Sequence, residues 1–158
     1  MPIEKNELRQ VMGHFATGVT IITTLTKTGQ IQGLTANAFT SVSLEPPLLL
    51  ISVDKKAESW PAFEESRVFT VNILADDQEG LSRKFAVSGG NKFEGVAYRI
   101  GANAAPILEG ALAYIECTLY AAYDGGDHSI YLGEVQQAEI REGKPLVFYR
   151  GGYRALGD

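Results

Sequence analysis

The sequence predicts a mainly β domain, in which antiparallel strands form a barrel with a few short helices at its ends. Segments rich in β-branched and apolar residues recur along the 158-residue chain. Turn signals such as KTGQ (27–30) and GG (125–126) separate them, which is typical of hairpins. About seven strands and three or four helices are expected, and an antiparallel barrel buries such a set most simply.

The first half of the chain begins with a short helix, because Leu8, Val11, Met12 and Phe15 recur at helical spacing. Residues 19–36 then read as a hairpin. EPP (45–47) interrupts the chain before LLLISVD (48–54), whose nearly continuous apolar run predicts a strand buried on both faces. A helix is expected at 58–66, with Ser59 as N-cap and Pro61 in its first turn.

The second half continues with a strand at 67–74 and a helix at 76–86, whose acidic first turn suits the helix dipole. Residues 88–106 read as a loop. Two long strands, 110–124 and 127–140, flank the GG turn, and a short strand at 146–149 precedes a glycine-rich tail. No linker or repeat divides the chain, so we expect one domain over residues 1–158.

Composition excludes several classes of protein. A net charge of −5 without a basic run argues against nucleic-acid binding. One cysteine, Cys117, allows no intrachain disulfide and reads as a core thiol, and with two histidines it predicts no zinc cage and no bound metal. The polar start MPIEKNELRQ is no signal peptide, and no apolar run could span a bilayer. A cytoplasmic protein is expected.

The chemistry is not carried by a familiar enzyme motif. The sequence contains no G-x-G-x-x-G after a strand, no phosphate-binding P-loop and no G-x-S-x-G nucleophile motif. It does contain GLTANAFTSVS (33–43), an extended stretch made mostly of small residues. Small side chains let a flat ligand approach the backbone, although they also permit close packing under a loop. A bound cofactor is therefore the expected source of any chemistry.

Six segments in order resemble the short-chain flavin reductase family, the NAD(P)H:flavin oxidoreductase components of two-component monooxygenases. They are FATGVTIITT, GLTANAFTSVSLEPPLLLISVDKKAES, LSRKFA, KFEGV, GGDHSIYLGEV and PLVFYRGGY, and they extend from about Phe15 to Tyr153. The resemblance implies an FMN-binding split β-barrel, a homodimer, FMN or FAD as cofactor, and NADH or NADPH as co-substrate. NADH is favoured, because no arginine pair is placed to hold a 2′-phosphate.

The resemblance also implies where flavin binds. The family often has serine at the position of Ala38. The expected contacts lie in three segments. They are Thr35, Ala36, Asn37, Ala38 and Thr40 or Ser41; Ser52, Val53, Asp54, Lys55 and Ser59; and Arg83 and Phe85. The second segment leads into a helix start, which suits a phosphate. The alternatives are that Ser59 acts only as a helix cap, that the lysines are solvated, and that Phe85 is a core anchor.

Two further residues are expected near the nicotinamide. His128 would orient the carboxamide or a flavin carbonyl, and it is the one expected catalytic residue, because a hydride passes directly from nicotinamide C4 to flavin N5. Tyr153 and Arg154, in the tail YRGGYR, would close over the same site, unless that tail is a frayed terminus. His14 receives no role.

The reaction expected is the reduction of FMN or FAD by NAD(P)H, with reduced flavin passed to a partner monooxygenase. Alternatives are a non-catalytic flavin carrier or sensor, and a ferric reductase that uses bound flavin. A related split-barrel oxidase acting on an amine would need a basic cluster for a substrate phosphate, and the sequence has none.

Overall fold

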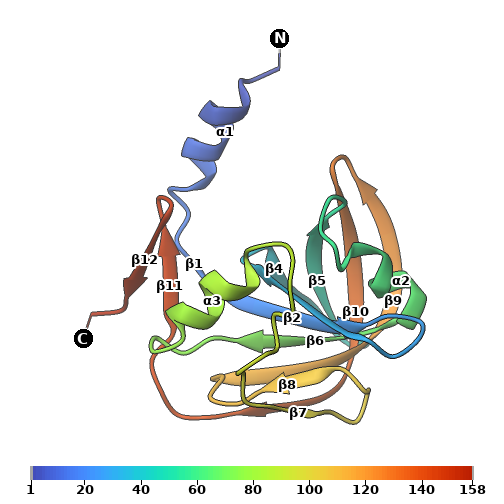
Figure 1. Ribbon diagram of the computed structural model, residues 1–158. Helices are drawn as coiled ribbons and strands as arrows, with labels where there is room; N and C mark the ends of the chain where they lie inside the picture. Colours follow the sequence, from blue (N-terminus) through green and yellow to red (C-terminus); the bar gives the residue numbers. More distant parts are fainter. Residues whose placement is uncertain (1, 158) are drawn as a thin grey trace.

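The computed structural model describes residues 2–157, and within them β-strands dominate (Figure 1). Three short helices occur in this range: α1 (Lys5–Met12), α2 (Trp60–Ser66) and α3 (Glu79–Phe85). The strands are β1 (Thr17–Gly18), β2 (Thr20–Leu25), β3 (Ile31–Ala36), β4 (Phe39–Leu44), β5 (Pro47–Asp54), β6 (Val68–Ile73), β7 (Tyr98–Ile100), β8 (Pro106–Leu108), β9 (Ala113–Gly125), β10 (His128–Ile140), β11 (Leu146–Tyr149) and β12 (Gly152–Ala155). The prediction of a mainly β, antiparallel domain with few helices is confirmed.

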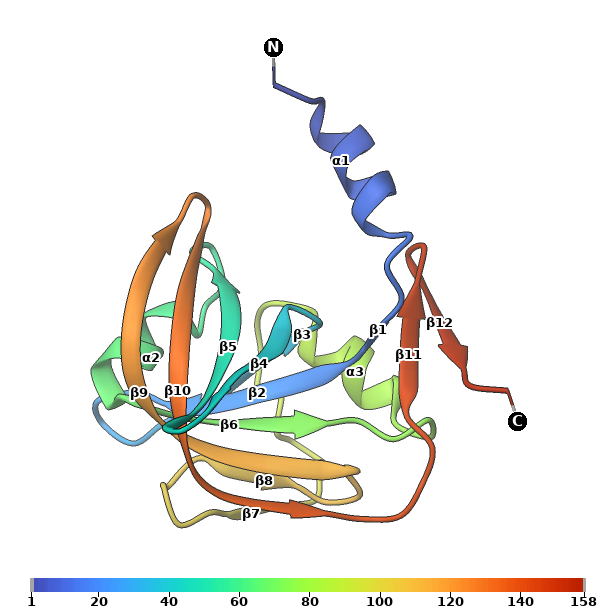
Figure 2. The same ribbon diagram turned by 180° about the vertical axis from the view of Figure 1, so that it is seen from behind.

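Seven of these strands form one antiparallel sheet in the order β3-β2-β6-β9-β10-β5-β4. The sheet is strongly curved in both views (Figures 1 and 2). Its two outer strands, β3 and β4, follow one another in sequence, yet no ladder joins them, so this sheet is not a closed barrel. One edge of β3 is therefore left without a partner strand.

Local sequence signals located most elements correctly. The first hairpin, the two long strands and the helices at 58–66 and 76–86 all form within a few residues of the predicted bounds. The loop expected at 88–106 is wrong in part, because it contains β7 and leads into β8, with which β7 pairs. The glycine-rich tail forms β12, which pairs with β11.

The prediction that the strand at 48–54 is buried on both faces is wrong. In β5, Leu49, Ile51 and Val53 are at most 3% exposed, whereas Leu48, Leu50 and Ser52 between them are half-buried. Successive side chains of a strand point to opposite faces, and only one face of β5 meets the main core. The other face keeps some contact with solvent although Leu48 and Leu50 on it are apolar.

Two hydrophobic clusters pack on opposite faces of the sheet at β2, because one includes Ile22 and the other includes its neighbour Ile21. The larger one includes Phe63, Phe69 and Tyr131, with the Phe63 and Tyr131 rings stacked at 5.5 Å between centroids. The second lies under α3 and includes Phe85 and Phe93, whose rings meet edge to face at 5.0 Å. This second cluster fixes α3 and the following loop on the hairpin β2–β3.

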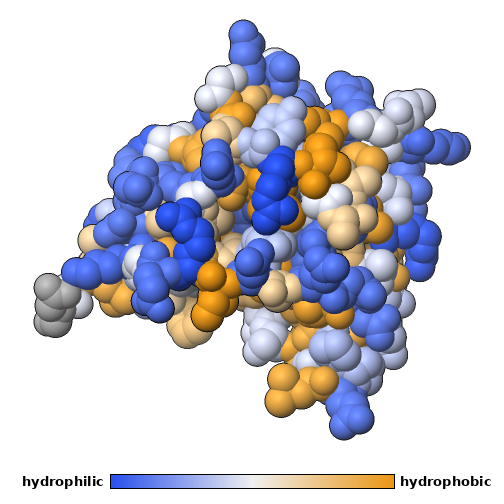
Figure 3. Space-filling view, turned by 90° about the horizontal axis from the view of Figure 1, so that it is seen from below, coloured by the Kyte–Doolittle hydropathy of each residue, from blue (hydrophilic) through white to orange (hydrophobic). Residues whose placement is uncertain are grey.

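Most of the surface shown is of ordinary composition, whereas helix α1 stands apart from the sheet. On the face drawn in Figure 3, hydrophobic residues lie in small groups among hydrophilic ones, which is ordinary for a protein surface. Helix α1 instead projects away from the rest of the chain in both ribbon views and buries none of its residues. Within residues 2–157, none of the helices has the length and apolar composition needed to cross a membrane.

Cys117 is a core thiol, as predicted, and we expect it to be chemically silent in the folded protein. It is fully buried on β9. Burial, together with the charge of Glu116, raises the pKa of the thiol to about 12. Because the thiolate is the reactive form, a disulfide reagent at pH 8 should release no colour until guanidinium unfolds the chain, and then one equivalent. Release of one equivalent from the folded protein would contradict this placement.

Candidate functional site

The free edge of β3 and the turn that follows it form the centre of the candidate site. Asn37 and Ala38 connect β3 to β4 and are exposed. The Ser52 N–H donates to the Ala38 carbonyl at 3.1 Å, and the Phe39 N–H donates to the Asn37 carbonyl at 3.0 Å. The turn is thus fixed against β5 while its small side chains face outward.

The next residues back along β3 are held by their neighbours. The Thr20 hydroxyl donates to the Ala36 carbonyl, and the Thr35 hydroxyl donates to the Ser82 carbonyl on α3, both at 2.6 Å. The Thr35 hydroxyl is therefore used to hold α3. We expect Thr35 and Ala36 to offer a ligand their backbone rather than side-chain polar groups.

A pocket of about 940 Å³ opens beside this turn. Asn37, Ala38 and Thr40 line one side of it, and residues of α1, β1 and β11 line the other. Thr17, which also lines the pocket, has a buried hydroxyl with no hydrogen-bond partner among the described residues. The volume and the small side chains fit a flat ring system, and the Thr17 hydroxyl is a polar group that such a ring could satisfy. Ser41 does not line this pocket; it pairs with Leu49 and is exposed.

The segment 52–59 supplies fewer ligand-directed side chains than expected. Val53 is fully buried in the main core, so only its backbone could reach a ligand. The Lys55 ammonium forms an ion pair with the Asp124 carboxylate at 2.5 Å, and this contact lowers the pKa of Asp124. The Asp54 carboxylate accepts the Lys56 N–H at 2.8 Å. The prediction of Lys55 as a free phosphate contact therefore lacks support from its geometry.

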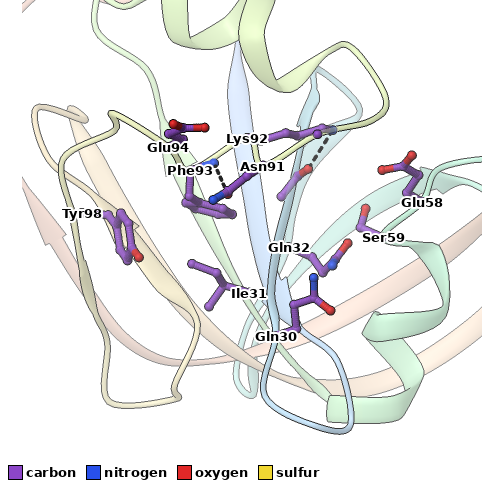
Figure 4. Close-up of a pocket in the computed structure, with 12 residues that line it drawn as sticks. Gln30, Ile31, Gln32, Glu58, Ser59, Asn91, Lys92, Phe93, Glu94 and Tyr98 are labelled. Atoms are coloured by element: carbon purple, nitrogen blue, oxygen red, sulfur yellow. Dashed lines mark hydrogen bonds between the residues drawn. The ribbon is translucent and has the colours of Figure 1, made fainter.

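Ser59 lies at the N-cap position of α2, as predicted, but does not cap it. Its side chain makes no capping hydrogen bond, and no other hydrogen bond to it occurs among residues 2–157. The residue is nevertheless only 3% exposed. It lines a second pocket, of about 700 Å³ (Figure 4).

His128 lies at the first residue of β10, in register with Asp54 of β5. Its ring Nδ1 lies 2.7 Å from the Asp127 carboxylate, and this hydrogen bond lowers the pKa of Asp127. With Nδ1 occupied, Nε2 is the ring atom left for a ligand. β5 lies between His128 and the Asn37–Ala38 turn, so His128 is roughly 10 Å from the turn across the sheet and roughly 7 Å along it.

Helix α3 and the tail meet at a third group of predicted residues. The Tyr153 hydroxyl is 2.6 Å from the Ser82 hydroxyl, and the Arg83 guanidinium lies 4.8 Å from the centroid of the Tyr153 ring. Tyr153 also packs on Phe148 at 5.3 Å. These contacts hold the tail against α3, so Tyr153 and Arg83 are neighbours. Phe85, by contrast, is 1% exposed and is a core residue, so its side chain is unable to line a ligand site.

Lys92 was missed by the sequence reasoning, although KFEGV contains it. Its ammonium donates to the Gly33 carbonyl on the free edge of β3 at 3.1 Å and to the Phe85 carbonyl at the end of α3 at 3.0 Å. Close contact here also requires a glycine, because a β-carbon at Gly33 would lie 2.9 Å from the Phe85 ring. Lys92 thus joins two of the predicted flavin segments. Nothing in the residues next to Lys92 in the sequence indicates that its side chain would join β3 to the end of α3.

Comparisons with known proteins agree with the fold. Residues 12–157 match the family model described as flavin reductase like domain. A flavin reductase of Pseudomonas putida is 40% identical over 96% of this chain and 89% of its own. The reductase subunit HsaB of a flavin-dependent monooxygenase from Rhodococcus jostii (strain RHA1) is 43% identical over 98% of this chain and 79% of its own.

A solved structure is similar over nearly the same extent. The NADH:FAD oxidoreductase SgcE6 of Streptomyces globisporus C-1027, in complex with NAD and FAD fragments, superimposes with a TM-score of 0.93 at 38% identity. The match covers 98% of this chain and 93% of that one.

Proposed function

This chain belongs to the flavin reductase family, and on that premise we propose how its residues carry out the reduction of FMN or FAD by NAD(P)H. It is an NAD(P)H-dependent flavin reductase, and the relatives' names favour NADH. The observation that carries the residue assignment is the Asn37–Ala38 turn: exposed small residues, fixed to β5, beside a pocket of about 940 Å³.

We propose that the rim of the flavin ring lies along the backbone from Thr35 to Ala38, with Ser52 and Asp54 on the facing strand. Bound flavin would supply the hydride acceptor. Chain residues would then hold the ring by backbone hydrogen bonds and leave one face open to the nicotinamide. His128, oriented by Asp127, would position the nicotinamide from the end of β10. Alignment of the two rings is the protein's main contribution to the rate.

The finer fold expected for this family, a split barrel, is part of the proposal. The open sheet with unpaired β3 and β4 edges supports it, because the split would lie between these two strands. The same opening would leave the β3 edge accessible to flavin. Reduced flavin would pass to a separate monooxygenase, as the names of relatives such as the HsaB subunit suggest.

We further propose that the chain is a homodimer and that α1 contributes to its interface. Leu8, Val11, Met12 and Phe15 are between 45% and 74% exposed, and an isolated helix of eight residues is not stable in water. Light scattering after size exclusion should give twice the 17.1 kDa of one chain. Val11→Glu should shift the mass toward one chain, whereas Glu7→Gln on the same helix should not. A measured wild-type mass of 17.1 kDa would contradict the proposal of a homodimer.

Steady-state kinetics test the function itself. Purified protein should oxidise NADH over many turnovers when free FMN or FAD is added, and should form peroxide in air. A carrier or sensor would bind flavin and leave NADH unconsumed. Failure of NADH and NADPH with both flavins would overturn the proposed function.

A further inference from the structure

The end of α1 and the turn between β11 and β12 meet at a small pocket of about 420 Å³. In both ribbon views the end of the helix lies beside the tip of this hairpin (Figures 1 and 2). The Arg150 N–H donates to the Gly13 carbonyl at 2.8 Å, and the His14 ring lies edge to face with the Tyr149 ring at 6.2 Å between centroids. Because α1 buries none of its residues, contacts at this junction are important for holding the helix.

The pocket brings two arginines together without a carboxylate. The residues that line it are Arg9, Gln10, Gly13, His14, Arg150 and Gly151. The Arg9 guanidinium donates to the neutral side-chain oxygen of Asn6 at 3.2 Å, and neither Arg9 nor Arg150 forms an ion pair with another described residue. Two like charges at one pocket repel each other, and an anion between them turns this repulsion into attraction. The charges of the lining therefore fit a small anion.

Arg150 occupies a position of the turn that disfavours arginine. Arg150 and Gly151 are the two residues between the paired ends of β11 and β12, and their φ angles are 50° and 75°. A two-residue turn with both φ angles positive favours asparagine followed by glycine, because a larger side chain is strained in this conformation. Strained residues of this kind gather at ligand sites. The turn thus holds a guanidinium group at the pocket at a cost in stability.

The pocket opens on the polar side of α1. Gln10 is about 160° around the helix from both Leu8 and Met12, since an α-helix has 3.6 residues per turn. A dimer contact through the apolar side of α1 therefore leaves Gln10 outside that contact. Arg9 and Gly13 also line the pocket of about 940 Å³, so the two cavities are neighbours. An anion here has to be distinguished from the phosphate of a bound flavin.

We propose that this pocket binds a free phosphate ion, which joins α1 to the β11–β12 hairpin through Arg9 and Arg150. A guanidinium group is planar and can donate two parallel hydrogen bonds to phosphate oxygens. One phosphate ion has enough oxygens to accept hydrogen bonds from both arginines. The bound ion would hold a helix that packing alone holds weakly. This inference does not rest on the proposed function.

Calorimetric titration with sodium phosphate, at an ionic strength kept constant with sodium chloride, tests the proposal. Wild-type protein should bind one phosphate per chain, and hydrogen exchange of the amides of residues 5–13 should slow at least threefold with phosphate. Arg9→Gln and Arg150→Asn should each weaken phosphate binding at least tenfold. Arg150→Asn should remain folded, with a melting temperature no lower than that of the wild type, because asparagine suits this turn. Arg141→Gln is the matched control, since Arg141 is exposed and lies outside the pocket, and its phosphate affinity should stay within twofold.

Three results would overturn the proposal. The first is phosphate affinity that is unchanged in Arg9→Gln and Arg150→Asn. The second is phosphate binding without slower exchange in residues 5–13, which would contradict the link between helix and hairpin. The third is competition of phosphate with FMN but not with riboflavin, which would assign the two arginines to the flavin phosphate. Absence of NADH oxidation would overturn the proposed function and leave this inference standing.

Discussion

Replacing Ala38 with phenylalanine is expected to weaken flavin binding at least 100-fold, about 2.7 kcal/mol of binding free energy. Ala38 is exposed at the turn between β3 and β4, where its carbonyl is held by the Ser52 N–H. A benzyl group there would occupy the space into which the flavin ring must come to reach the backbone. Fluorescence titration with FMN and FAD measures the loss.

The fold should tolerate this change, because an exposed side chain leaves the core unaltered. The melting temperature of Ala38→Phe should therefore stay close to that of the wild type. Ala38→Ser adds a hydroxyl with little volume and should keep flavin affinity within about threefold. If Ala38→Phe binds flavin as well as the wild type does, the ring does not lie against this turn.

Replacing His128 with alanine is expected to lower kcat between about tenfold and 100-fold, while flavin affinity stays within threefold. The expected loss is one of alignment, since a misplacement of about 1 Å can cost 100-fold in rate. His128 is held by Asp127 at the end of β10, beyond the turn that is expected to hold the flavin. Stopped-flow reduction at saturating flavin separates the chemical step from binding.

The second histidine provides the control for this experiment. His14 is exposed near the end of α1, where its Nδ1 lies 2.7 Å from the Gln10 carbonyl, and His14→Ala should keep the wild-type reduction rate. A collapse of flavin affinity in His128→Ala, with the rate at saturating flavin intact, would show that His128 binds the flavin and does not position the nicotinamide.

The sequence was informative where structure depends on neighbouring residues. Alternating or β-branched runs and glycine turns located the long hairpin around Gly125–Gly126 and the start of β10 at His128. β12 was missed, because a four-residue strand with the sequence GYRA has no periodic pattern and forms by pairing with β11.

Those features of the candidate site that depend on side-chain size and on the two-residue period of a strand could be predicted from the sequence. Val53 shares a face with Leu49 and Ile51, so the period of a strand already implied that its side chain is buried. The pairing of Lys55 with Asp124 and the bonds of Lys92 to Gly33 depend on residues at least 59 positions apart. Such contacts exist only once the sheet has formed.

The charge of Lys92 at the open border of β3 has a consequence for the solution behaviour of this protein. A strand with unpaired backbone groups is a template on which another chain can add, and a lysine placed there opposes such addition. Removing the flavin that is proposed to lie along β3 would uncover this edge, and Lys92 would then oppose the addition of another chain. Replacing Lys92 with an apolar residue should therefore increase self-association of the flavin-free protein during storage.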